Sequence, residues 1–126
     1  MPASYFKRMK FNEQVTIENY IIKFAKDNGA ETVEIQTNAI LLRDKNFVKT
    51  LKKAGLNKAF VAFHSHIPEI HEYLVGKKGA YKDCLAGIKN LLAEKIKVDL
   101  NPVITSRSYN YLFYKRFICS TKLLFY

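Results

Sequence analysis

Three histidines are the residues in this sequence whose spacing comes nearest to a metal site. His64 and His66 are separated by one residue, and His71 follows shortly after them. On a strand, the first two side chains would point to the same face, and such a pair at the carboxyl end of a barrel strand begins the zinc site of some hydrolases. A zinc site also needs further ligands and groups that orient them, and only Glu69 and Glu72 are close in sequence. We therefore keep a zinc-dependent hydrolase as an alternative.

The two cysteines, Cys84 and Cys119, lie far apart and form no recognisable ligand set. Without an export signal we expect a reducing compartment, in which two ordinary thiols are the expected state. No apolar run approaches the roughly 18 residues of a membrane span, so the sequence predicts a cytoplasmic protein without a transmembrane segment. There is also no Ser–His–Asp order, glycine-rich phosphate loop or dinucleotide fingerprint.

The net charge of +10 raises the question of nucleic-acid binding. The lysines are dispersed along the chain, between apolar residues at helical spacing, which is typical of a solvated helix face. They include Lys23, Lys26, Lys49, Lys52 and Lys53. Because no recognised binding motif accompanies them, the sequence does not favour a nucleic-acid partner.

Helix-forming segments alternate with strand-forming segments three times. The segments with apolar residues at helical spacing run from Thr16, a possible N-cap, to Asn28, and from Asp44 to Gly55, and a third carries Leu85, Ile88, Leu91 and Leu92. The segments with strand composition are Thr32–Thr37, Lys58–His64 and Ile96–Thr105. Of these, Lys58–His64 is nearly all apolar, as in a parallel strand covered on both faces.

This alternation predicts an α/β fold with a parallel sheet and right-handed crossovers. Functional residues are then expected beyond the carboxyl ends of the strands. The pattern stops near the end of the chain, where the segment Tyr109–Tyr126 is basic and aromatic and no acidic residue follows Asp99.

Segments in this order resemble the middle of the radical S-adenosylmethionine (SAM) barrel. IQTNAILL at Ile35–Leu42 is similar to the family's strand that ends in Thr-Asn-Gly, with Ala39 in place of the glycine. The segment Ala59–Thr105 is similar to the family's fourth strand, its "e-x-H-[DE]…G…G-[ST]-[FY]" segment, the following helix and the fifth strand. With the helix from Thr16, the resemblance covers roughly residues 14 to 112. It implies a partial (β/α) barrel with about three parallel strands in residues 1–112.

Resemblance to this family also implies a cofactor set. Its members hold a [4Fe–4S] cluster with a Cys-x3-Cys-x2-Cys loop, and SAM chelates the open iron and is cleaved to a radical. That loop is absent from this sequence, and so is the acidic Gly-Gly-Glu segment that would precede Thr16. We therefore expect a truncated radical SAM domain that is inactive alone and binds neither SAM nor the cluster by itself. Whether the chain is an enzyme stays open.

Five positions match places at which the family contacts SAM or substrate. They are Thr37, Asn38, Ser65, Asn101 and Thr105. The resemblance accounts for His64 and His71 without a metal.

Two further expectations follow from a half-barrel. A non-catalytic binding or scaffold module is the main alternative function, and open sheet edges predict self-association. We interpret residues 113–126 as an irregular tail translated out of the parental reading frame, because its composition changes abruptly.

Overall fold

The computed structural model describes residues 11–102 and 104–106, with side chains from residue 17 onward. Its elements, in chain order, are α2 (Phe11–Asp27), β1 (Glu34–Thr37), the 3-10 helix η1 (Leu41–Arg43), α3 (Lys45–Ala54), β2 (Lys58–Val61), α4 (Pro68–Val75), α5 (Ala80–Ala93) and β3 (Lys97–Leu100). The tail interpreted above as out of frame lies outside the described residues. No described helix has the length and apolar character needed to cross a membrane.

The three strands form one parallel sheet in the order β1–β2–β3. Glu34, Lys58 and Lys97 are neighbours at its amino end, as are Thr37, Val61 and Leu100 at the other end. The predicted α/β class, with parallel strands alternating with helices, is therefore confirmed. Each strand has only 4 residues and is shorter than the sequence predicted.

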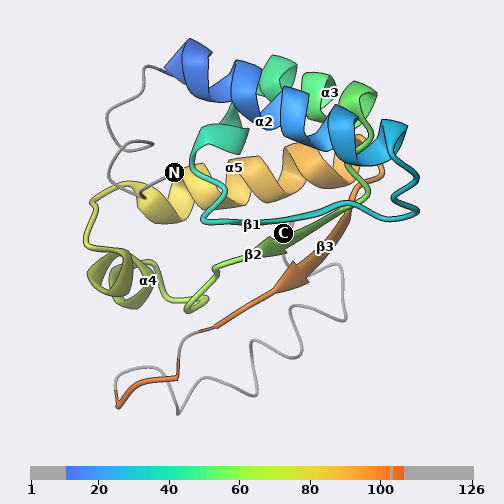
Figure 1. Ribbon diagram of the computed structural model, residues 1–126. Coiled ribbons are helices and arrows are strands. Elements are labelled where there is room, and N and C mark those ends of the chain that lie inside the picture. The colour runs from blue at the N-terminus through green and yellow to red at the C-terminus, as the bar shows by residue number, and fades with distance from the viewer. Residues whose placement is uncertain (1–10, 103, 107–126) are drawn as a thin grey trace.

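Helices α2, α3 and α5 lie together on one face of the sheet, and α4 stands beside the chain that leaves β2 (Figure 1). The burial of β2 follows this arrangement, since Ala59 and Val61 are buried while Lys58 and Phe60 are only half-buried. The sequence predicted a strand covered on both faces. In the described part of the chain the helices cover one face, and we call the other the uncovered face.

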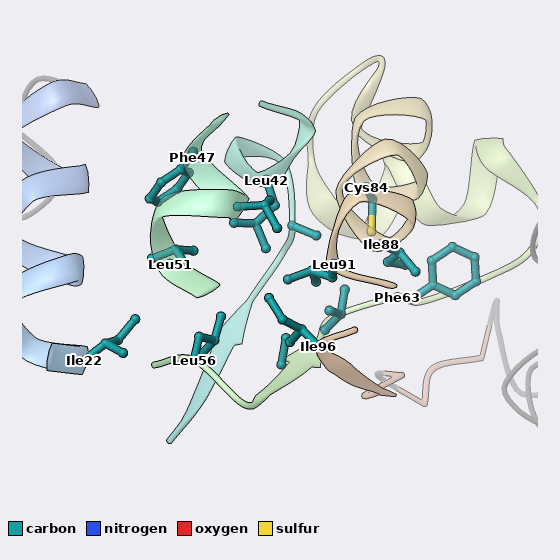
Figure 2. Close-up of a cluster of buried hydrophobic side chains, with 14 residues drawn as sticks. Ile22, Leu42, Phe47, Leu51, Leu56, Phe63, Cys84, Ile88, Leu91 and Ile96 are labelled. Atoms are coloured by element: carbon teal, nitrogen blue, oxygen red, sulfur yellow. The ribbon is translucent and has the colours of Figure 1, made fainter. Parts of the chain in front are cut away.

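The core lies between the sheet and its helices (Figure 2). Most of its side chains come from the apolar stripes that the helical spacing predicted for α3 and α5, together with Leu42 of η1 and residues just before the strands. They include Leu42, Phe47, Leu51, Leu56, Ile88, Leu91 and Ile96, each at most 4% exposed. Removal of this much apolar surface from water is the main force that holds helices on the sheet. The corresponding prediction for α2 was wrong in part, since Tyr20, Ile21 and Phe24, which share the helical spacing, are exposed.

Helix α3 begins and ends as its sequence predicts. The Asp44 side chain accepts hydrogen bonds from the backbone N–H of Asn46 and Phe47 at 2.8 and 3.1 Å. Gly55 ends the helix with φ of 116°, in the region that favours glycine.

Two helix predictions were wrong. Thr16 is not an N-cap, because α2 already begins at Phe11. The segment around Pro68 was not among the predicted helices, yet it forms α4, which has Pro68 in its first turn and ends at Gly76. An 8-residue helix is too short for helical spacing to stand out from a loop.

The turn after β1 packs tightly against α5. Ala39 is fully buried and has φ of 61°, the left-handed conformation that costs a non-glycine residue about 1 kcal/mol. This is the position at which the resembling family has glycine. Gly87 of α5 faces this turn, and a Cβ added to it would overlap the carbonyl oxygen of Ala39.

Gly87→Ala should therefore destabilise the fold by about 2 kcal/mol, because the added methyl has no room. Urea unfolding followed by circular dichroism measures this, with Lys82→Ala on the exposed side of the same helix as control. At an open helix position, Gly→Ala would instead stabilise by about 1 kcal/mol. A gain of that kind would contradict the close packing.

Candidate functional site

The carboxyl edge of the sheet brings two of the predicted site residues to the same level. The ladder continues one residue past the strands, since the N–H of Ala62 donates to Thr37 O at 2.8 Å and that of Asn101 to Val61 O at 2.7 Å. Asn38, Ala62 and Asn101 thus occupy equivalent positions on adjacent strands. Both asparagines are exposed, so their amides can donate and accept hydrogen bonds at this edge.

Thr37 and Asn38 also shape the turn after β1. Thr37 Oγ1 accepts a hydrogen bond from the N–H of Ala39 at 3.0 Å, and Asn38 Oδ1 accepts one from Ile40 at 3.1 Å. Side chains that bond to the backbone two residues on are typical of turns. The Asn38 amide oxygen therefore has a structural role.

Ser65 and Thr105, the other two predicted residues, do not belong to the row that Asn38, Ala62 and Asn101 form along the carboxyl edge of the sheet. Ser65 is fully buried, and its Oγ accepts a hydrogen bond from the N–H of Ile67 at 3.1 Å, in the turn that leads into α4. Thr105 is half-buried and lies beyond the end of β3. A direct contact from Ser65 to a ligand at the edge would require this turn to open.

A cavity of about 750 Å³ lies along β1 next to this row. Its polar lining includes Gln36, Thr37 and Asn38 from β1 and the turn after it, together with Glu18 from α2, and apolar side chains such as Phe47 supply much of the rest. Lys77, from the loop after α4, also lines it. Its lining thus combines an apolar surface with hydrogen-bonding groups at the strand end, which is the common composition of a small-molecule site.

Two of the three histidines, His64 and His71, are buried, and His66 is half-buried. His71 is 1% exposed, and its Nδ1 accepts a hydrogen bond from the backbone N–H of His64 at 3.1 Å. The His71 ring lies 5.4 Å from that of Phe63, and Tyr81 OH donates to the carbonyl of His66 at 3.2 Å. Within the described ranges, no three His, Cys, Asp or Glu side chains gather in a way that could hold a metal ion. The His-x-His pair thus has no ligand set there.

An ion-pair cluster on the uncovered face was not foreseen. Lys58 Nζ lies 2.7 Å from Asp99 Oδ2 and 3.2 Å from Glu34 Oε2, so one ammonium joins all three strands. The hydrogen bond to Asp99 contributes most to raising the pKa of Lys58. The same hydrogen bond contributes most to lowering the pKa of Asp99. Barrel interiors are usually filled by Val, Ile and Leu, so this face is unusually polar. Its signal in the sequence was a charged residue in each strand, but only the register reveals that they meet.

Cys84 is unsuited to binding iron. Its side chain is fully buried in the core, and burial raises the pKa of the thiol to about 12. Iron–sulfur clusters are held by thiolates, so a thiol that stays protonated is a poor ligand. Cys119 lies outside the described residues. The residues that the structure describes therefore do not fit a [4Fe–4S] cluster.

The sequence matches no known family profile, but it is similar to three curated proteins. It is 30% identical over 88 residues to the GTP 3',8-cyclase of Aquifex aeolicus (strain VF5), which is 70% of this chain and 27% of the cyclase. It is 32% identical over 88 residues to the GTP 3',8-cyclase of Helicobacter pylori (strain HPAG1), covering 26% of that protein. It is 34% identical over 85 residues to the Fe-coproporphyrin III synthase of Methanosarcina barkeri (strain Fusaro / DSM 804), or 68% of this chain and 21% of the synthase. The chain thus matches about a quarter of the length of these relatives.

Burial of Cys84 predicts a protected thiol. In a Cys119→Ser variant, where Cys84 is the remaining cysteine, Ellman's reagent at mildly alkaline pH should react slowly in native buffer and stoichiometrically in urea, because only unfolding exposes the sulfur. The reaction is followed by absorbance. Rapid, complete reaction without urea would show that the thiol is accessible and contradict its place in the core.

Proposed function

Because this chain belongs to the radical SAM superfamily, we propose that β1, β2 and β3 are middle strands of such a barrel and that the chain has no site for the iron–sulfur cluster. By this proposal the chain alone does not cleave SAM. The observation that carries the proposal is the state of Cys84, which is buried and has a raised thiol pKa. Two cysteines far apart in sequence cannot replace three on one loop.

The row of Asn38, Ala62 and Asn101 at the carboxyl edge of the sheet is the part of the site that this chain contributes. In a complete barrel of the family, the exposed amides at the positions of Asn38 and Asn101 would contact the polar groups of SAM, whereas by this proposal the chain alone does not bind SAM. Thr37 holds the turn that presents Asn38, through its hydrogen bond to Ala39. Ser65 has the same kind of role in the turn into α4. Thr105 is retained as a contact only on the strength of the family resemblance.

A non-catalytic scaffold or binding module is the second candidate, and the ion-pair cluster favours it. Glu34, Lys58 and Asp99 give the uncovered face charged groups that tolerate water. Such a face does not need a closed barrel to shield it from water, although Phe60 and Ala62 add some apolar surface to it. An apolar inner face would be one reason to expect self-association, and the charged groups weaken that reason. The open strand edges remain a second reason to expect it.

Anaerobic reconstitution of the chain with iron and sulfide tests the proposal. We expect no stable absorbance band near roughly 400 nm, and no 5′-deoxyadenosine from SAM after dithionite is added, because the thiolates needed for a cluster are missing. A Cys84→Ala variant, treated in the same way, measures iron that binds without this cysteine.

A band with about four irons per chain in the wild type, together with SAM cleavage, would overturn the proposal. If that band were lost in Cys84→Ala, the core position of Cys84 would be wrong as well. No cluster combined with specific binding of another ligand would favour the scaffold alternative.

A further inference from the structure

The outer surfaces of α2 and α3 meet in a groove that carries positive charge. The two helices run side by side above the sheet (Figure 1). Between them lies a groove of about 670 Å³, lined on the α2 side by Tyr20, Lys23 and Lys26 and on the α3 side by Thr50 and Lys53. Asp27 is the acidic residue in this lining. Lysines that are dispersed in sequence are thus gathered in space.

The charge of the groove is available to a ligand. The sequence of α3, KNFVKTLKKA, has no acidic residue, and its Lys49 and Lys53 are exposed. In the part of the chain that the structure describes, the salt bridges involve Arg43 and Lys58, and neither Lys23 nor Lys53 takes part in one. Lys26 is held differently, with its Nζ donating to the carbonyl of Glu31 at 2.8 Å.

Tyr20, which lines the groove, is paired on α2 with a second exposed aromatic ring, that of Phe24. Tyr20 is 70% exposed and Phe24 is 57% exposed. Their ring centroids are 6.3 Å apart with an interplanar angle of 23°, so they form a nearly parallel pair open to solvent. Exposed rings of this size cost hydration free energy, and they commonly mark a surface that another molecule covers.

We propose that the α2–α3 groove binds single-stranded nucleic acid. Lys23 and Lys53 neutralise backbone phosphates along the groove, and Tyr20 and Phe24 provide faces on which bases stack. A basic groove combined with stacking rings is the arrangement by which proteins hold single strands without reading their sequence. This inference is independent of the radical SAM proposal, because the groove is formed by the outer surfaces of α2 and α3 and not by the sheet edge.

Two other polyanionic partners fit the groove less well. An acidic helix would need an apolar groove for its anchors, whereas Lys23, Thr50 and Lys53 make this lining polar. An anionic membrane is bound by helices with an apolar face along several turns. Among residues 17–27 of α2, whose side chains the structure describes, the strongly exposed apolar residues span little more than one turn, from Tyr20 to Phe24.

Fluorescence anisotropy with a fluorescein-labelled oligouridylate tests the proposal. Tyr20→Leu with Phe24→Leu should weaken binding about tenfold, because stacking is lost while apolar surface is kept. Lys23→Gln with Lys53→Gln should reduce the slope of log Kd against log salt by about 1.4, since each single-strand phosphate contributes about 0.7. All four side chains belong to the outer surface, so circular dichroism should be unchanged.

Lys78→Gln with Lys82→Gln is the matched control, because it removes the same charge from exposed positions elsewhere. This control should leave affinity within about twofold of the wild type. An equal loss in the control pair, an unchanged affinity in the leucine pair, or no binding at low salt would each overturn the proposal. A flotation assay with phosphatidylcholine–phosphatidylserine vesicles provides a further check. Binding to the vesicles that is stronger than binding to the oligouridylate, and that the leucine substitutions do not weaken, would also overturn the proposal.

Discussion

The close approach of α5 to the turn after β1 is the constraint on which the arrangement of this protein depends. Asn90 is buried, and its Nδ2 donates to the carbonyls of Leu42 and Arg43, each at 2.9 Å. One turn earlier on the helix, Gly87 allows the backbone of Ala39 to come near. A buried amide that donates to two carbonyls is costly to lose, because an unpaired polar group in the interior destabilises the fold. These contacts fix the turn through residues distant in sequence.

The position of the candidate site follows from this constraint. With η1 held against α5, the side chains of Thr37 and Asn38 close the turn at the end of β1. Parallel pairing then sets Asn101 on the same edge, through its N–H bond to Val61. Below this row, Lys58 ties Glu34 and Asp99 together across all three strands. The described part of the protein therefore has exposed amides at the carboxyl edge of the sheet and charged groups on its uncovered face, while the thiol of Cys84 lies inside the core.

Local features of this fold could be predicted from sequence, and features that depend on contacts between elements could not. Asp44 and Gly55 bound α3 as expected because capping and the left-handed conformation are properties of single residues. The Lys58 cluster could not be foreseen, since a charged residue in each short strand does not reveal the register. The burial of Ser65 was missed for the same reason, because it depends on how the turn into the unforeseen α4 packs. Likewise, Lys23 and Lys53 looked like separate solvated faces until α2 and α3 were placed side by side.

The central claim is that this chain has the parallel β/α arrangement of its family without iron or SAM. Amide hydrogen exchange on the metal-free chain, resolved by residue with NMR, tests it most directly. The account predicts that the amides of residues 58–62 in and after β2 exchange among the slowest, together with those of Ile88 and Leu91 in α5, because β2 is bonded on both sides and lies under the core. Protection confined to the helices, with β2 exchanging as fast as an unfolded chain, would contradict it.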